Sequence, residues 1–267
     1  MTRSLCFTVD VDRDVNIPLP GTLEAGSVDR GMGTAPRYSS SAEGLKILTD
    51  LLDEMGVNAT YFVEGRTLLN IGGGMLAGRE VGIHGMDHED FTGIFPPGEK
   101  ERIINESCEN LEDMLGIRPV CSRMPYMKIP PDVPEILKRA GIKYDSSEYQ
   151  PLNERMIPYS LSGLTEIPVP RGIDAGGKKI FGYLWPMHEG KRKPSDYAYM
   201  ASKMEEGIFV LATHAWHMTE RIEGGVMSED SISANSENLR KTIEHFIDLG
   251  YETETIPQAS HRFARTS

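Results

Sequence analysis

Four stretches of the chain repeat one order of features, namely a helical apolar pattern, a glycine and a short strand-like run. Residues 43–55 carry leucines at helical spacing before Gly56, and residues 57–63 then read as a strand. The same order recurs at 99–115 with Gly116, at 134–140 with Gly141 and at 236–249 with Gly250. Glycine just past a helix accepts the left-handed conformation that ends it. The repetition therefore predicts parallel βα units around one sheet.

Additional strand patterns raise the expected number of strands. Residues 5–12 and 81–84 alternate apolar with polar or small side chains, and apolar runs occur near 165–169 and 208–213. The chain has 267 residues, enough for one large domain with a sizeable core. We therefore expect an α/β fold, a distorted (β/α) barrel of seven to eight strands, forming a single domain over residues 1–267. An open doubly wound sheet is the alternative.

Two long segments interrupt the repeat. Residues 13–42 are rich in Gly, Pro and Ser, and residues 171–195 hold several glycines and the basic run Lys191-Arg192-Lys193. Long loops after barrel strands usually lie on the functional face, so both segments are candidates for a lid or a substrate groove. The alternative is that they are solvated surface insertions.

Two carboxylates and two imidazoles end predicted strands. Asp10 and Asp12 share one face at the end of the first strand, and His84 closes a later strand just before the loop that carries His88. Each pair alone is commonly incidental. Together, a His-x-x-x-His and a remote carboxylate match a catalytic site with three protein ligands and an open position for water. The residues therefore predict a divalent metal site, with zinc expected and cobalt, nickel or manganese as alternatives, in a metal-assisted hydrolase.

The amino-acid composition limits the classes of partner that this chain can bind. The chain is 39% hydrophobic and 25% charged, as in ordinary globular proteins, and its formal net charge is −12. The acidic balance argues against nucleic acid or an anionic membrane surface as the main partner. No apolar stretch approaches the length of a membrane span, and the first residues lead straight into a strand pattern. The charge balance says little about a small-molecule or oligosaccharide amide as substrate, and we expect a cytoplasmic protein, either monomeric or a homo-oligomer.

The cysteines and the remaining histidines receive weaker predictions. Cys108 falls on the apolar face of a predicted helix and Cys6 and Cys121 fall in predicted strands, so all three are expected to be buried free thiols. His188 lies in a loop pattern and is expected to face solvent. Trp216 and His217 follow His214 closely, and they either line the cleft or pack in the core.

Five motifs at predicted strand ends carry a family resemblance. These are Asp10 with Asp12, His84-x-x-x-His88, Arg123-x-Pro125-Tyr126, Asp145, and Leu211-x-x-His214. Their order resembles that of the five motifs of the polysaccharide deacetylases (NodB-like), a family that includes chitin and peptidoglycan deacetylases. The resemblance spans roughly residues 5–255, and it implies the distorted barrel already read from the repeat.

The resemblance implies a role for each motif residue. Asp10 would be the catalytic base, and Asp12 would bind the metal beside His84 and His88. His214 would be the general acid that protonates the leaving amine, and Arg123 would orient the base. The backbone N–H of Tyr126 would help stabilise the oxyanion, Asp145 or its neighbours would support His214, and Leu211 would line the acetyl pocket.

The chemistry of amide hydrolysis fits these residue types. Metal coordination lowers the pKa of water from about 16 toward about 7. A positioned acid or base adds on the order of 10²–10⁴-fold, and an oxyanion donor about 3–4 kcal/mol. An amine leaves poorly as an anion, so an imidazole that donates a proton is needed on the departing side.

Two departures bear on the substrate. Val11 separates the two aspartates, a spacing similar to a subgroup with peptidoglycan-deacetylase-like and allantoinase-like members. The fourth motif reads Asp145-x-x-Glu148-Tyr149 instead of Asp-x-x-Asp-Trp. The leading hypothesis is a metal-dependent deacetylase acting on an N-acetylated sugar or a related small amide. The alternatives are an allantoinase-like hydrolase of cyclic amides, with or without a metal, and an inactive carbohydrate-binding barrel.

Overall fold

The computed structural model describes residues 2–94, 96, 98–153 and 155–264. Its main sheet contains seven neighbouring parallel strands in the order β11-β7-β6-β5-β4-β1-β14. These strands are β1 (Arg3–Val11), β4 (Ala59–Val63), β5 (Glu80–Ile83), β6 (Cys121–Ser122), β7 (Tyr144–Asp145), β11 (Leu164–Glu166) and β14 (Glu206–His214). The short strands β9 (Arg155–Met156), β10 (Tyr159–Leu161) and β17 (Glu252–Thr253) extend the sheet. The parallel βα fold predicted from the repeat is confirmed.

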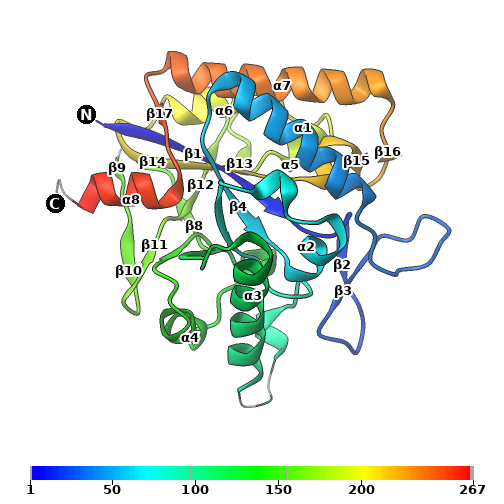
Figure 1. Cartoon of the computed structure of the whole chain (residues 1–267). Helices are drawn as coiled ribbons and strands as arrows, with labels where there is room; N and C mark the ends of the chain where they lie inside the picture. Colours follow the sequence, from blue (N-terminus) through cyan, green and yellow to red (C-terminus); the bar gives the residue numbers. More distant parts are fainter. Residues whose placement is uncertain (1, 95, 97, 154, 265–267) are drawn as a thin grey trace.

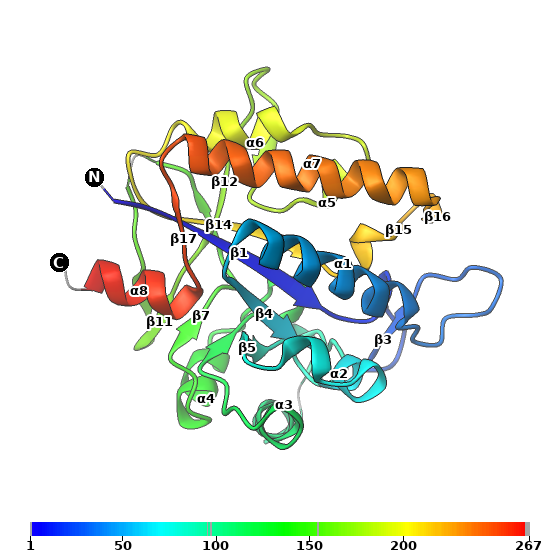
Figure 2. The same ribbon diagram turned by 45° about the horizontal axis from the view of Figure 1, so that its top comes forward.

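Helices surround the sheet (Figures 1 and 2). In Figure 2, α1 and α7 lie together on one side of the central strands, while α2, α3 and α4 lie on the other. The helices are α1 (Ser39–Met55), α2 (Gly65–Ile71), α3 (Glu99–Leu115), α4 (Val133–Arg139), α5 (Trp185–His188), α6 (Pro194–Ala201), α7 (Glu229–Asp248) and α8 (Ile256–Ala264). Helix α3 has the predicted bounds, whereas α1 and α7 begin four and seven residues earlier than predicted. Their first turns are polar, so apolar spacing did not mark them.

Glycines end the two longest helices of the first half as predicted. Gly56 follows α1 with φ 66°, and Gly116 follows α3 with φ 70°. Side chains with a Cβ rarely adopt this left-handed backbone. Each glycine therefore allows the chain to leave its helix and enter the next strand.

The sheet curls until its two edges approach each other. Strand β10 forms one edge and β9 the other, yet only residues 157 and 158 separate them in sequence. Residues 182–184 add to the far side of β14, where Leu184 N–H donates to the carbonyl of Ala212 at 2.8 Å. They follow a second sheet of β8 (Tyr149–Pro151), β12 (Val169–Ile173) and β13 (Lys179–Phe181). The result is a distorted barrel, as expected, and not an open sheet.

Two apolar clusters fill the interior. The larger cluster lies between strands and outer helices and includes Phe7, Leu48 and Phe246. The smaller one includes Cys6 and Val210 and takes in Phe263 of α8. Ile256, the first residue of α8, bonds Thr60 near the start of β4, so α8 covers that end of the barrel. The opposite, carboxyl end of the strands is left for polar side chains.

The cysteine prediction is confirmed: Cys6, Cys108 and Cys121 are buried free thiols. The long segments are partly structured. The first contains the hairpin of β2 (Asn16–Pro18) and β3 (Ala25–Ser27), and the second contains β13 and α5. Near the end of the chain, β15 (Glu220–Arg221) pairs with β16 (Gly225–Val226). No described helix is long and apolar enough to cross a membrane.

Candidate active site

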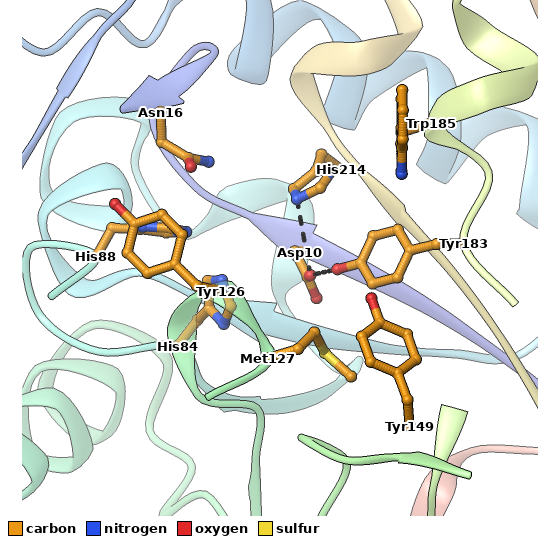
Figure 3. A pocket seen from close by; sticks show the side chains of 10 residues that line it. All are labelled: Asp10, Asn16, His84, His88, Tyr126, Met127, Tyr149, Tyr183, Trp185 and His214. Atoms are coloured by element: carbon orange, nitrogen blue, oxygen red, sulfur yellow. Dashed lines mark hydrogen bonds and ion pairs between the residues drawn. The ribbon is translucent and has the colours of Figure 1, made fainter. Parts of the chain in front are cut away.

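A pocket of about 240 Å³ opens at the carboxyl ends of the strands (Figure 3). Strands β1 and β14 pair so that Asp10 lies opposite His214, and His84 directly follows β5. Both long segments contribute to the walls, as predicted, through Asn16 from the first and Trp185 from the second. The lining residues are Asp10, Asn16, His84, His88, Tyr126, Met127, Tyr149, Tyr183, Trp185 and His214.

Asp12, His84 and His88 lie together at the edge of this pocket, as predicted. Their candidate ligand atoms are all within 4.8 Å of one another, and all three residues are buried. Nε2 of His88 is 3.3 Å from Oδ2 of Asp12. Nδ1 of His84 is 2.7 Å from the carbonyl oxygen of Arg123 and donates to it, which leaves the lone pair of Nε2 free.

The electrostatics of these three residues fit a cation. Asp12 accepts a hydrogen bond from Asn16 at 2.5 Å, but its Oδ1 and Nε2 of His84 have no hydrogen-bond partner among the described residues. Burial raises the pKa of Asp12 to about 7 and lowers that of His88 to about 4. A buried carboxylate facing two neutral imidazoles lacks a positive partner, and a divalent ion supplies one. One oxygen and two imidazole nitrogens suit zinc and the neighbouring first-row metals.

Asp10 lies next to this cluster and is held by two donors. Nη1 of Arg123 donates to Oδ1 at 2.9 Å, and the hydroxyl of Tyr183 donates to Oδ2. Burial by itself raises the pKa of Asp10, but the charges of Arg123 and the nearby histidines, with the Tyr183 hydrogen bond, lower it to about 2. Asp10 is therefore ionised at neutral pH, the state that a base requires.

The Arg123 side chain is fully buried and spans several strands. It also donates to Thr8 at 2.8 Å and twice to Ser146, at 2.9 and 3.0 Å. The predicted pairing of Arg123 with Asp10 is thus present in the structure.

His214 reaches the same place from β14. Its Nε2 lies 4.0 Å from Oδ2 of Asp10 and 3.9 Å from Oδ2 of Asp12. The imidazole lies between Tyr183 and Trp216, with ring centroids 5.2 and 5.3 Å away. In Figure 3, His214, Asp10 and Tyr183 converge from one side of the pocket and His84 and His88 from the other. This places a carboxylate and an imidazole beside the candidate metal ligands.

Tyr126 lines the pocket with a strained backbone. Its φ is 59° and that of Met127 is 54°, both in the left-handed region. Such conformations persist where the surroundings hold them, and they cluster at functional sites. The Tyr126 ring meets His88 edge-on, with centroids 4.5 Å apart. The strained turn brings Tyr126 to the pocket, where its backbone N–H would stabilise the oxyanion as predicted.

Two supporting predictions are corrected by the structure. Asp145 accepts hydrogen bonds from Ser122 and from Ser147 N–H, at 2.5 and 3.1 Å, and pairs with Glu166, so it braces the loop around Arg123 instead of His214. Leu211 packs in the outer cluster, because alternation along β14 turns it away from the face that carries His214. It is not among the pocket residues.

His188 is also corrected. It is 1% exposed, with Nδ1 2.6 Å from Oδ1 of Asn235 and Nε2 2.8 Å from the Thr213 hydroxyl. The turn of α5 buries it against α7, which a loop pattern does not reveal. His217 and Trp216 are buried too, and His217 pairs with Glu189 at 3.0 Å, so packing is the correct alternative for both.

Sequence reasoning missed the aromatic walls of the pocket. Tyr183 is the most consequential omission, since it bonds Asp10 from a segment 173 positions away. The only signal was its place in residues 171–195, which were predicted to border the site. Tyr149 and Trp185 complete the wall and remain partly exposed.

Comparison with known proteins supports the resemblance. Residues 39–144 match the polysaccharide deacetylase family model. A peptidoglycan deacetylase-like protein of Gibberella zeae is 31% identical over 110 residues, which cover 39% of this chain and 32% of that protein. A peptidoglycan deacetylase of Helicobacter pylori is 26% identical over 178 residues, covering 59% and 60% of the two chains. The chain thus spans about a third and three fifths of these relatives.

Solved structures share the fold over almost the whole chain. A Mycobacterium smegmatis protein assigned to the polysaccharide deacetylases gives a TM-score of 0.67 at 22% identity, covering 99% of this chain and 91% of that one. The PuuE allantoinase gives 0.65 at 15% identity with the same coverage. A Bacillus anthracis pseudoenzyme of family CE4 gives 0.56 at 13% identity, covering 97% and 66%.

The matched segment, residues 39–144, contains both histidines of the candidate metal site and Arg123, and the shared fold extends over nearly all of the chain. The resemblance carried by the five motifs is therefore confirmed: in the matched residues 39–144 and in its fold, this chain is similar to the polysaccharide deacetylases, a family of hydrolases that act on amide C–N bonds.

Proposed function

We propose that the protein is a metal-dependent deacetylase that hydrolyses the N-acetyl amide of a neutral N-acetylated sugar or a related small amide. One observation carries the proposal: Asp12, His84 and His88 converge within 4.8 Å, and Asp10 and His214 flank them in the same pocket. The proposal treats residues 1–267 as one catalytic domain and expects zinc as the metal.

The geometry and the balance of the reaction support the proposed role of each residue. A bound divalent ion would polarise the amide carbonyl and acidify water. Hydrolysis bonds the water oxygen to the carbonyl carbon, breaks the C–N bond and adds a proton to the leaving nitrogen. Asp10, ionised and oriented by Arg123, accepts the proton from water. His214, whose Nε2 lies 3.9 Å from Oδ2 of Asp12, donates a proton to the nitrogen, and the Tyr126 N–H would bond the oxyanion.

The pocket favours a small, uncharged substrate. Its volume of about 240 Å³ is below the usual range for drug-sized ligands, roughly 300–1,000 Å³. No lysine or arginine is found among its described lining residues, so apart from the metal and His214 no group there would pair with an anionic substrate. Tyr126, Tyr149, Tyr183 and Trp185 offer ring faces and polar edges, which suit a ring with apolar faces and hydroxyls.

The test uses the zinc-loaded protein of residues 1–267 and a substrate panel: N-acetylglucosamine, its β-1,4-linked dimer and tetramer, and cyclic amides including allantoin. We expect acetate and free amine in equal amounts, with kcat/KM no higher for the tetramer than for the dimer. Asp10→Asn is the control that retains the pocket but lacks the base.

Other outcomes separate the alternatives. Ring opening without acetate release would favour a cyclic-amide hydrolase. A folded protein that binds the sugars but releases no acetate would favour a carbohydrate-binding barrel.

A further inference from the structure

A fully buried arginine directly follows the candidate metal ligand Asp12. The Arg13 side chain has no exposed surface, and neither does its partner Glu64. The pair is bonded at three points: Arg13 N–H donates to Oε2 of Glu64 at 2.7 Å, Nε donates to Oε1 at 2.7 Å, and Nη2 also contacts Oε1. Thr67 adds a hydrogen bond to Oε2 of Glu64 at 2.6 Å.

The Arg13 guanidinium also forms hydrogen bonds with the loop that carries His88. Its Nη2 donates to Oδ1 of Asp87 at 3.0 Å, and its Nη1 donates to the carbonyl of Ala25. Asp87 is also paired with Arg66 at 2.9 Å. Arg13 thus ties the end of β1, where Asp12 sits, to the residue just before His88.

The loop needs this restraint. His88 has φ 53°, an unfavourable backbone for a residue with a Cβ. The first residues of α2, directly after Glu64, bond backbone carbonyls that precede His88 in the loop. Gly65 N–H donates to the carbonyl of Gly85 at 3.0 Å, and Arg66 N–H donates to that of Met86 at 2.8 Å. Glu64, Arg13 and Asp87 are therefore in position to fix the separation of Asp12 and His88.

A buried cation beside a metal site is electrostatically costly, because it repels the incoming ion in a region of low dielectric. We propose that Glu64 is a positioning residue with two effects: it orients Arg13 so that the metal ligands are held apart correctly, and it neutralises Arg13 so that a divalent cation is not repelled. This inference rests on the metal-dependent proposed function and names the residues that set its metal affinity.

The experiment measures zinc affinity by competition with a chelating dye, together with thermal unfolding of chelator-treated protein. Glu64→Gln keeps the shape and an acceptor oxygen but leaves the Arg13 charge uncompensated. The double variant Arg13→Gln with Glu64→Gln restores neutrality. Glu106→Gln, which removes one of the two carboxylates paired with the exposed Arg102 on α3, is the matched control for loss of one carboxylate.

We expect Glu64→Gln to weaken zinc binding by about 10–100-fold, the usual effect of removing a partner behind a metal ligand. The double variant should recover at least half of that loss on a logarithmic scale, and Glu106→Gln should match wild type. Should Glu64→Gln fail to fold, Asp87→Asn replaces it. This substitution should also weaken zinc binding, but less, because Arg66, the second cation paired with Asp87, can be solvated by water.

The outcomes discriminate between roles. Two results would overturn the neutralising role. One is wild-type zinc affinity in Glu64→Gln. The other is a double variant that binds zinc as weakly as the single variant or more weakly, because a purely structural loss of affinity would grow with each contact removed. A wild-type protein that binds no divalent metal would instead overturn the proposed function.

Discussion

Arg123→Lys is the substitution that best separates positioning of the base from binding of the metal. Lysine keeps the positive charge, but a single ammonium cannot reproduce the fork that bonds Asp10, Thr8 and Ser146 together. If the ammonium stays near Asp10, both bonds to Ser146 are lost. Each lost hydrogen bond costs about 1 kcal/mol, and more where a buried group is left unpaired. We expect a stability loss of about 2–3 kcal/mol.

The expected loss of unfolding free energy can also be expressed as a decrease in Tm. For a domain of this size, 1 kcal/mol corresponds to roughly 2–4 °C in Tm, so Arg123→Lys should unfold about 5–10 °C earlier. Arg123→Met should cost more, about 3–5 kcal/mol, because the buried Asp10 carboxylate loses its cation. Turnover should fall by about 100-fold in Arg123→Lys, since a misplaced base is as costly as other misalignments of about 1 Å.

Metal content should not change, because His84 is held by the Arg123 backbone carbonyl and not by its side chain. The assays are urea unfolding, steady-state kinetics and metal analysis of the same preparations. Arg102→Lys, on the exposed face of α3, is the control and should change stability by less than about 0.5 kcal/mol. Wild-type turnover in Arg123→Lys, or loss of the metal with the fold intact, would refute this reasoning.

Three further substitutions probe the pocket and its surroundings. His214→Ala should lower kcat by about 10²–10⁴-fold with metal retained, and loss of the metal would make His214 a ligand instead of the acid. Tyr183→Phe removes one hydrogen bond to the Asp10 carboxylate and should lower kcat by roughly 10-fold or more. An unchanged kcat would mean that Tyr183 only lines the pocket and does not assist Asp10. His188 is buried with a pKa lowered to about 4, so its neutral form stabilises the fold above its ordinary pKa of about 6.5, and this stability is lost as pH falls toward 4. The difference in unfolding free energy between pH 7 and pH 5 should therefore be smaller in His188→Gln than in wild type, and equal differences would contradict this assignment.

The parts of the site that sequence predicts are those fixed by local periodicity. Alternation along β1 puts Asp10 and Asp12 on one face, and the strand pattern before His84 puts that histidine at the same edge of a parallel sheet. Because carboxyl ends of parallel strands meet, residues distant in sequence converge without any knowledge of packing. The same rule puts His214 at this edge, and the structure shows it opposite Asp10.

The parts that sequence does not predict depend on tertiary pairing. Tyr183 reaches Asp10 because residues 182–184 add to β14, and nothing in their composition specifies that partner. His188 is buried because α5 packs beside α7, although its segment reads as a polar loop. Asp145 is directed to Ser122 and Ser147 by the short β6–β7 pairing, a two-residue contact too brief to leave a pattern.

Metal stoichiometry across three variants tests the central claim most directly. Protein loaded with zinc, desalted and assayed by elemental analysis should carry about one ion per chain in wild type and in Asp10→Asn, and close to none in Asp12→Ala and His84→Ala. Only wild type should turn over. Equal metal content in all four proteins, whether high or absent, would contradict the assignment of Asp12 and His84 as ligands and of Asp10 as the base beside them.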